Sequence, residues 1–423
     1  MRPLCLLKTR GRPPVSWEQC IRVLGGWTGY EPGQVEVREA DESGPREVWI
    51  GLNRKTSRYR CSGCGKLCAR YHDAEEREVL DLPILGVRVR LFLWRFRAAC
   101  PRCGPRLEAL DWLEPRSRVT RRMAEDVARL CRVLPIKHVA ERFGLDWHTV
   151  KAIDKAWLAR TLPPLDMTGV TKLIMDEFAI HKGHRYATII LDADTRKVLA
   201  VGHGRGREAV RPFFEAIGVE ARSRIQAVAM DMHAPFEVEV RAQCPKAEIV
   251  YDLFHVVMKY GREVIDRVRV DEANRLKKDK AARKVVKGSK WLLLANRENL
   301  TEPSQRVRLK ELLKANEALM TVYLLRDDLK RLWGYTREGW ARRAWEDWLA
   351  RALESGITPL KTFALNFAKR IDGILAQCRW RLNTSVLEGV NNKVKVIKRM
   401  AYGFRDDDYF FLKIRAAFPG VSR

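Results

Sequence analysis

Two aspartates at the ends of apolar segments are the first residues whose setting suggests chemistry. Asp176 follows Leu173-Ile-Met, and Asp231 follows Val228-Ala-Met. A carboxylate at the end of a buried strand is costly unless a cation or a divalent metal ion pairs with it. Either aspartate alone could simply cap a turn or a helix, but two at equivalent strand ends of a basic α/β segment favour a metal site. Phosphodiester chemistry uses clustered carboxylates to hold two Mg²⁺ ions about 3.5–4 Å apart.

A third metal-binding acid is expected from a helix further along the chain, and Glu388 is the best candidate. It lies in the segment Leu382-Asn-Thr-Ser-Val-Leu-Glu-Gly-Val-Asn-Asn-Lys-Val-Lys, in which Thr384 or Ser385 could cap a helix. The residues of this segment that could meet phosphate groups are Asn392, Lys393 and Lys395.

Other acids compete for a place in this site. Glu177 alternates to the other face of its strand, and Asp192 and Asp194 lie in a turn. Asp252 ends a later strand, and His255 follows it three residues on, where the two could buttress the site. A capping aspartate beside a packed histidine explains the same pair about equally well.

Four cysteines in two C-x-x-C pairs have the arrangement that a structural Zn²⁺ requires for closed tetrahedral coordination. The pairs are Cys61-x2-Cys64 and Cys100-x2-Cys103, and the glycines Gly65 and Gly104 follow them. The pairs are separated by 35 residues, so a hairpin must bring them together.

Cys68 and His72 are rival zinc ligands close to the first pair. Ordinary reduced cysteines near two turns are the other interpretation, but paired C-x-x-C motifs favour zinc. The chain has ten cysteines in 423 residues, which does not indicate a disulfide scaffold. Paired cysteines of this kind are typical of intracellular metal sites, so we expect a cytoplasmic protein.

Ala140-x3-Gly144, between two predicted helices, matches the layout of a helix-turn-helix. Ser117 or Thr120 could cap a first helix with apolar positions at Met123, Val127, Leu130 and Leu134, and a shorter helix from Ile136 to Phe143 ends at Gly144. The next helix, which starts near Trp147, would enter the major groove. The residues of that helix that could face DNA are Trp147, His148, Lys151 and Lys155. An αα-hairpin packed in another core is the alternative, but a helix-turn-helix is favoured beside a basic zinc module.

The elements that must position these groups begin with a β-rich module that extends to about Trp112. Its alternating runs place arginines on one face, as in Val87-Arg-Val-Arg-Leu-Phe-Leu-Trp-Arg-Phe-Arg, which predicts strands with a basic outer face. Residues 117–160 have helical periodicity, and Thr161-Leu-Pro-Pro-Leu-Asp is typical of a linker.

The remainder of the chain, from about Val170, has the pattern of an α/β domain. Three strands joined by short turns come first, and a helix, a strand, another helix and the strand that ends at Asp252 follow. From His255 to about Cys378 the sequence becomes helical, basic and rich in tryptophan.

The net charge of the chain is +27, from 80 Lys and Arg against 53 Asp and Glu. Such a positive protein needs a polyanionic partner, and nucleic acid is the first candidate. Hydrophobic residues make up 46% of the chain, which excludes global disorder. We expect no membrane span and no secretory signal, because no apolar run approaches about 18 residues and the first residues carry charges and prolines.

Three strings of residues resemble the bacterial insertion-sequence transposases of the ISL-three (L-three type) family, and the resemblance covers nearly the whole chain. The strings are Arg381-Leu-Asn-Thr-Ser-Val-Leu-Glu-Gly-Val-Asn-Asn-Lys-Val-Lys-Val-Ile-Lys-Arg-Met-Ala-Tyr-Gly-Phe-Arg, Ala229-Met-Asp-Met-His-Ala-Pro-Phe and Val250-Tyr-Asp-Leu-Phe-His-Val-Val. The cysteine module and the central helices resemble that family's zinc-binding and helix-turn-helix regions. Cys68, a third thiol near the first pair, is a departure that concerns the zinc ligation.

The resemblance implies an α/β fold with an RNase H-like catalytic domain and a DDE triad of Asp176, Asp231 and Glu388. It implies a zinc-binding domain over residues 1–114, a helix-turn-helix over 115–162 and the catalytic domain over 163–423. Residues 254–380 would be an all-α insertion, and Asp252-x2-His255 resembles a motif that accompanies it.

The function implied is that of a DNA transposase in the bacterial cytoplasm, associated with the nucleoid. It would bind the terminal inverted repeats of its element, hydrolyse phosphodiesters at the ends and join the 3′-OH strands to target DNA. Its cofactors would be Mg²⁺ (or Mn²⁺) and a structural Zn²⁺, and its partner double-stranded DNA, bound as a homo-oligomer. The alternatives are a DNA-binding regulator with an inactive RNase H-like domain and an RNase H-like nuclease or resolvase.

Overall fold

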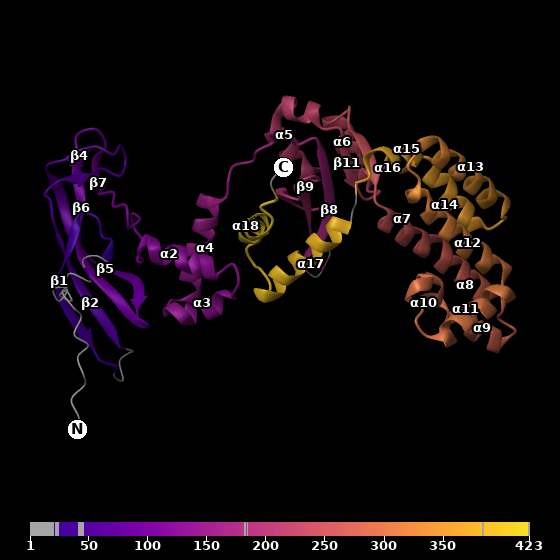
Figure 1. Cartoon of the computed structure of the whole chain (residues 1–423), viewed down its shortest axis with the longest axis horizontal. Helices are drawn as coiled ribbons and strands as arrows, with labels where there is room; N and C mark the ends of the chain where they lie inside the picture. Colours follow the sequence, from indigo (N-terminus) through magenta and orange to yellow (C-terminus); the bar gives the residue numbers. More distant parts are fainter. Residues whose placement is uncertain are drawn as a thin grey trace, which may run out of the picture. The chain divides into compact units, whose positions relative to one another are not determined.

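The computed structural model describes residues 21, 25–40, 46–181, 183, 185–382 and 385–421. Contacts divide the chain into two compact units, Met1–Thr161 with Met400–Gly403 and Leu162–Arg399 with Phe404–Arg423 (Figure 1). No helix in these described stretches is both long enough and apolar enough to cross a membrane. The expectation about a secretory signal concerns residues outside the described ones.

The first unit contains a five-stranded sheet of order β1-β2-β6-β5, with β7 paired to β6. The strands are β1 (Tyr30–Arg38), β2 (Glu47–Arg54), β5 (Tyr71–Ile84), β6 (Val87–Cys100) and β7 (Gly104–Leu107). A small hairpin of β3 (Tyr59–Arg60) and β4 (Leu67–Cys68) accompanies the sheet. The long β5–β6 hairpin carries the chain from the first cysteine pair to the second, as the sequence predicts.

The arginines of β6 do not form the single basic outer face that their alternation predicts. Arg88 and Arg90 lie together and pair with Glu47 of the neighbouring β2, at 3.0 and 2.6 Å. Arg95 is buried and donates to the carbonyl oxygen of Glu108 at 3.2 Å. The odd spacing between Arg90 and Arg95 moves Arg95 to the opposite face of the strand.

Three helices follow the sheet in the first unit, as predicted for a helix-turn-helix. They are α2 (Arg121–Leu130), α3 (Ile136–Phe143) and α4 (Trp147–Thr161). Thr120 caps α2, because its side chain accepts a hydrogen bond from the backbone N–H of Met123. Gly144 ends α3 at φ 60°, a left-handed conformation that favours glycine. A cluster of buried apolar side chains holds the three helices together.

Asp81 of β5 anchors these helices to the sheet. Its buried side chain accepts hydrogen bonds from Trp27 Nε1 at 2.8 Å, Thr120 Oγ1 at 2.6 Å and Arg122 Nε at 2.7 Å. The backbone of Leu80 also exchanges two hydrogen bonds with residues 118–120, each of 2.9 Å. The start of α2 is therefore fixed to the edge of β5.

The second unit contains a mixed sheet of order β10-β9-β8-β11-β12. The strands are β8 (Lys172–His181), β9 (Arg185–Asp192), β10 (Val198–His203), β11 (Ala227–Met230) and β12 (Glu248–Tyr251). β8, β9 and β10 form an antiparallel meander, whereas β11 runs parallel to both β8 and β12. The helices α5 (Arg207–Arg224) and α6 (Ala234–Gln243) connect β10 to β11 and β11 to β12.

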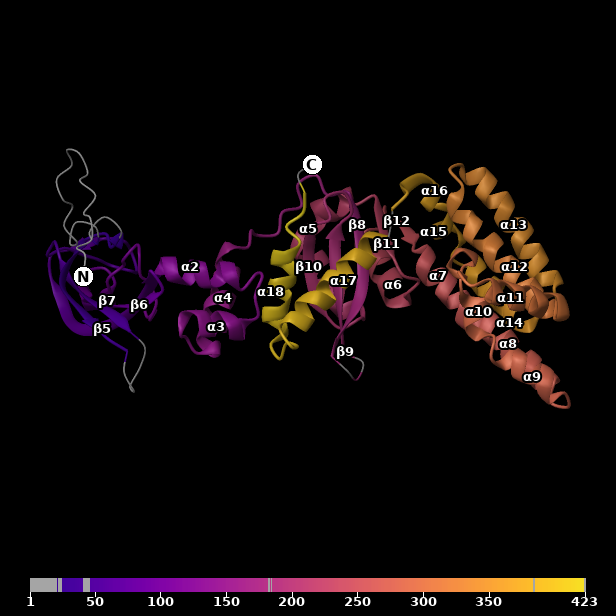
Figure 2. The ribbon, with the colours of Figure 1, turned by 60° about the horizontal axis from the view of Figure 1, so that its bottom comes forward.

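The chain returns to this sheet through its last two helices, α17 (Ser385–Met400) and α18 (Asp407–Ala417), which lie beside it in both views (Figures 1 and 2). α17 begins at Ser385, but Thr384 and the side chain of Ser385 lie outside what the structure describes, so the predicted cap is untested.

Between β12 and α17 the chain is helical throughout the described residues. The helices are α7 (Leu253–Tyr260), α8 (Asp266–Arg275), α9 (Lys280–Lys287), α10 (Lys290–Leu294), α11 (Pro303–Ala315), α12 (Glu317–Arg331), α13 (Glu338–Glu354), α14 (Thr358–Ala368), α15 (Ile371–Leu375) and α16 (Gln377–Trp380). Trp345 and Trp348 stack in their core with ring centroids 5.2 Å apart. This core is continuous with the buried face of the sheet.

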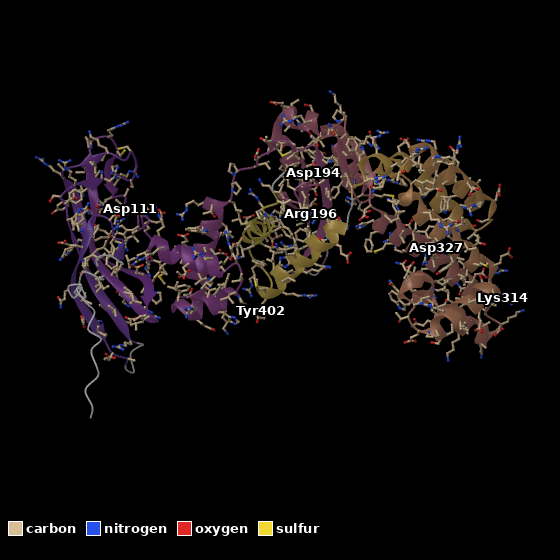
Figure 3. The ribbon with its side chains drawn as sticks, viewed as in Figure 1. Asp111, Asp194, Arg196, Lys314, Asp327 and Tyr402 are labelled. Carbon is tan, nitrogen blue, oxygen red and sulfur yellow. The ribbon has the colours of Figure 1, made fainter. Side chains whose placement is uncertain are left out.

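Replacing Asp81 by asparagine should destabilise the first unit. The change removes the negative charge that faces Arg122 and two other donors, so we expect the free energy of unfolding to fall by about 3 kcal/mol. Calorimetry of the full-length protein measures the loss. The matched control is Asp111→Asn, an exposed aspartate of the same unit (Figure 3), which should leave unfolding unchanged. Equal stability of the two variants would show that Asp81 is not an anchor.

Candidate active site and metal centre

Asp176 lies in the middle of β8, not at its end as predicted from the sequence. The strand continues to His181 because Glu177 and Ala179 pair with β9. Asp176 is 4% exposed. Its Oδ1 accepts from the backbone N–H of Glu177 at 2.8 Å and its Oδ2 from Asn391 Nδ2 at 2.7 Å. Burial raises the pKa of Asp176, and these two hydrogen bonds oppose that increase.

Asp231 follows β11 directly, as predicted. Ala229 of β11 pairs with Ile174 of β8, and continuing this register by two residues places Asp231 level with Asp176. Oδ1 of Asp231 accepts from the backbone N–H of Met232 at 2.5 Å, and Oδ2 lies 3.2 Å from His255 Nδ1. The side chain is about a third exposed, so a ligand can reach the carboxylate.

His255 of α7 connects Asp231 to Asp252. Its Nε2 lies 3.7 Å from Asp252 Oδ2, while Asp252 caps α7 by accepting from the backbone N–H of Phe254. The aspartate therefore caps the helix, as the second interpretation of this pair predicts, and the histidine also reaches Asp231, whereas a role in supporting the site stays a prediction.

The charges around His255 set its protonation. Burial by itself would lower its pKa, but the hydrogen bond and charge of Asp231, with the charges of Asp176 and Asp252, raise it to about 9. For Asp231 the effect of burial has the opposite sign and raises the pKa. The interaction with His255 outweighs burial and leaves the pKa of Asp231 below its usual value. At neutral pH an imidazolium therefore faces a carboxylate.

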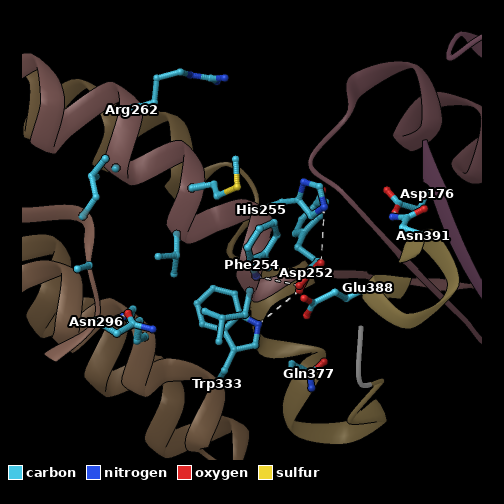
Figure 4. A pocket seen from close by; sticks show the side chains of 18 of the residues that line it. Asp176, Asp252, Phe254, His255, Arg262, Asn296, Trp333, Gln377, Glu388 and Asn391 are labelled. Carbon is cyan, nitrogen blue, oxygen red and sulfur yellow. Dashed lines mark hydrogen bonds and ion pairs between the residues drawn. The ribbon is translucent and has the colours of Figure 1, made fainter. Parts of the chain in front are cut away.

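A cavity of about 1300 Å³ opens beside these acids (Figure 4). Asp176, Asp252 and His255 line it from the sheet side, and Glu388 lines it from α17. Asp231 is not part of the lining itself but contacts it through His255. Figure 4 shows Glu388 close to Asp252, and Asn391 beside Asp176.

One face of α17 supplies the polar lining of this cavity. Glu388, Asn391, Asn392 and Lys395 recur at the spacing of one helical face and all line it. Lys393 does not line it, and its predicted contact with phosphate stays a prediction. Its Nζ donates to the carbonyl oxygen of Ala417 at 2.5 Å and lies 4.7 Å from the centroid of the Phe418 ring.

The sequence did not point to Asn391 as a member of the site, and it offered Glu177 only as a competing acid. Asn391 follows Glu388 by three residues, so helical periodicity was the available signal. Glu177 lines the cavity although strand alternation placed it on the other face of β8. Asn391 Oδ1 and Glu177 Oε2 are buried and have no hydrogen-bond partner within the described residues, so both are acceptors that a cation could satisfy.

The three predicted metal-binding acids lie in this region, but their carboxylate oxygens are not close enough together to coordinate one metal ion. Within the described residues, one group of His, Cys, Asp or Glu has three or more ligand atoms within 4.8 Å of one another, and it consists of cysteines. The donor set of Asp176, Asp231 and Glu388 nevertheless suits a hard divalent cation, which prefers carboxylate oxygens.

The cysteine group comprises Cys61, Cys64, Cys100 and Cys103, as predicted. Sγ of Cys64 and Sγ of Cys100 are 3.6 Å apart. The backbone N–H groups of Arg102 and Cys103 point at Cys100 and lower the pKa of its thiol to about 6 against the effect of burial. Gly65 and Gly104 have φ of 73° and 68°, which lets the chain turn tightly after each pair. Four thiols at this separation could hold zinc.

Cys68 and His72, the rival ligands, lie outside this group. Cys68 is buried beside it, but its Sγ donates to the carbonyl oxygen of Lys66 at 3.8 Å. His72 is exposed and pairs with Asp73 at 3.0 Å.

The first turn of α4 carries the most exposed of the predicted DNA-facing residues. Trp147 and His148 are exposed, with ring centroids 3.5 Å apart. Lys151 and Lys155 lie further along the helix and are half-buried. Asp146, which the sequence analysis did not single out, accepts from the backbone N–H of His148 at 2.8 Å.

Comparison with known protein families matches both units. Residues 173–414, more than half of the chain, match a family model described as "Transposase", the DDE domain of the ISL3 transposases. Residues 108–158 match the helix-turn-helix domain of transposase family ISL3.

Individual relatives agree with these matches. The transposase for insertion sequence element IS1001 of Bordetella parapertussis is 53% identical over 401 residues, which are 95% of this chain and 98% of that protein. The transposase for insertion sequence element IS1557 of Mycobacterium tuberculosis is 26% identical over 397 residues, 88% of each chain. This chain therefore belongs to the ISL3 family of insertion-sequence transposases.

Proposed function

We propose that this transposase binds the terminal inverted repeats of its element, hydrolyses a phosphodiester at each end and transfers the freed 3′-OH strands to target DNA. One observation carries the proposal. Asp176 of β8 and Glu388 of α17 line one cavity, and Asp231, which follows β11, contacts that lining through His255.

The catalytic domain is proposed to be RNase H-like. Support comes from the antiparallel meander β8–β10 joined to two parallel strands in the order β10-β9-β8-β11-β12. In that arrangement Asp176 is on the central strand and Asp231 follows its parallel neighbour. Glu388 then comes from the helix that returns to the sheet after the long helical stretch.

Asp176, Asp231 and Glu388 would hold divalent metal, Mg²⁺ or Mn²⁺. Bound metal of this kind activates water or a 3′-OH and stabilises charge on the phosphate. The remaining steps fall to residues of the chain. His255 holds Asp231 in place, Asn391 orients Asp176, and Lys395 with Asn392 faces the phosphate backbone from α17.

DNA recognition is assigned to the first unit. The exposed Trp147 and His148 would enter the major groove from α4. The net charge of +27 supplies the attraction for phosphate that sequence-independent binding requires. Pairing two element ends calls for a homo-oligomer on DNA, and the bacterial nucleoid is where its substrate lies.

The four clustered cysteines are proposed to hold a structural Zn²⁺ at the open end of the β5–β6 hairpin, opposite its turn. Such a metal would fix the sheet that anchors the helix-turn-helix.

Amide substitution of the three acids should abolish cleavage. We expect Asp176→Asn, Asp231→Asn and Glu388→Gln each to slow Mg²⁺-dependent cutting of DNA that carries the element's ends by at least about 100-fold, because each removes a metal ligand. End binding in a mobility-shift assay should persist. Asp194→Asn, on the exposed β9–β10 turn (Figure 3), is the matched control and should cut normally.

Full cleavage by Glu388→Gln would refute the assignment of the third ligand. Specific binding by the wild-type protein without cutting would favour the regulator. Cuts that follow DNA structure instead of the inverted repeats would favour a resolvase.

Cys64→Ser should lose zinc, whereas Cys68→Ser should keep it. We expect about one zinc ion per wild-type chain, measured by elemental analysis after extensive dialysis. The first unit of Cys64→Ser should also melt at a lower temperature, because zinc no longer closes the hairpin. Zinc retained by Cys64→Ser, or lost by Cys68→Ser, would overturn the four-cysteine assignment.

A further inference from the structure

The cavity beside the acids continues away from them along a wall of exposed apolar side chains. Phe254 and Met258, one turn apart on α7, are 62% and 57% exposed, and Trp291 of α10 is 77% exposed. All three line the cavity, together with the half-buried Trp333. Figure 4 shows Phe254 and Trp333 near Asp252 and Glu388, so the apolar wall is adjacent to the acids.

Packing within the protein does not account for these side chains. The buried core of the helical stretch is built from other aromatic residues, such as Trp345, Trp348 and Phe367. Large apolar groups that remain exposed together inside a hollow mark a binding surface.

Cationic side chains stand among these aromatic ones. Arg262, Lys290, Lys330, Arg381 and Lys395 all line the same cavity. Lys290 pairs with Asp266 at 2.9 Å and Lys330 donates to Asn296, whereas Lys395 extends from the same face of α17 as Glu388. Aromatic faces interleaved with Lys and Arg are typical of sites for single-stranded nucleic acid, in which bases stack and phosphates pair. An apolar protein segment would offer Arg381 and Lys395 no anionic group to pair with.

A base can reach such a wall only after it has left the double helix. In a duplex the faces of the bases are covered by their neighbours, so aromatic side chains contact them only when a nucleotide is unpaired or extruded. The cavity, at about 1300 Å³, exceeds the roughly 300–1,000 Å³ of ordinary small-molecule sites. It has room for more than one nucleotide.

We propose that Phe254, Met258 and Trp291 form a stacking site for unpaired nucleotides of the DNA end whose phosphate lies at the acids. The inference rests on the proposed function, since it takes DNA to be the substrate. It adds a substrate requirement, namely that the end is opened locally before or during cutting. Trp291 is a binding residue in this scheme and takes no part in the metal site.

The test measures binding in EDTA, so that cleavage does not enter the result. Full-length protein is titrated with two DNA fragments of the same sequence, one fully paired and one with four unpaired nucleotides at the end, the first of them replaced by fluorescent 2-aminopurine. We expect wild type to bind the opened fragment about 10-fold more tightly and to quench its fluorescence. Trp291→Ala should lose most of both effects.

The matched control is Trp340→Ala. Trp340 lies on α13, is 56% exposed and does not line the cavity, so its removal should leave both effects intact. Equal affinity of wild type for the two fragments, or equal losses in Trp291→Ala and Trp340→Ala, would overturn the proposal. A preference for opened DNA in a protein that never cuts would uphold the stacking site and refute the proposed function. DNA cutting by a protein that shows no preference for opened DNA would uphold the proposed function and refute the stacking site.

Discussion

An acidic side chain buried in the middle of a strand needs hydrogen-bond donors or cations around it, and Asp176 imposes that requirement on the second unit. Asn391 supplies one donor from α17, and the imidazolium of His255 supplies positive charge from α7. The two helices are separated by more than a hundred residues along the chain. Both helices must reach Asp176 on the central strand β8, so the long helical stretch can vary only in ways that preserve the positions of its two ends.

The strand order serves the same requirement. With β11 next to β8 and parallel to it, a chain that leaves β11 brings Asp231 level with Asp176. Asp252, capping α7 after the adjacent β12, then holds His255 against Asp231. Asp231, His255 and Asp252 thus form a linked group, while Asp176 has its own donors in Asn391 and the backbone N–H of Glu177. Glu177 Oε2 and Asn391 Oδ1 have no hydrogen-bond donor within the described residues, so a cation could bind to them.

Much of this arrangement follows from patterns in the sequence. The C-x-x-C pairs, the cap at Thr120 and the glycine after Phe143 are local signals, and the structure confirms them. Where the sequence failed, the missing information was geometric. The pause in the apolar pattern at Asp176 and Glu177 resembles a strand end, but pairing with β9 carries β8 on to His181.

The orientation of side chains was the other feature that the sequence predicted poorly. Lys393 lies off the face of α17 shared by Glu388, Asn391 and Lys395, and a helical projection would have shown that it does not line the cavity. Arg95 lies on the opposite face of β6 from Arg90 because the spacing between them is odd, and there it is buried and donates to the carbonyl oxygen of Glu108. The apolar wall of the cavity was also beyond prediction, since exposed aromatics in a tryptophan-rich stretch look like core residues until the packing is known.

The central claim is that Asp176, Asp231 and Glu388 bind metal ions in one site. Metal-directed cleavage of the polypeptide backbone tests this claim most directly. Fe²⁺ that replaces Mg²⁺ at the site generates hydroxyl radicals in the presence of ascorbate and peroxide, and these cut the backbone next to the bound metal. We predict cuts near residues 176, 231 and 388, all suppressed by excess Mg²⁺. Cuts confined to the two strands, with α17 left intact, would contradict the account.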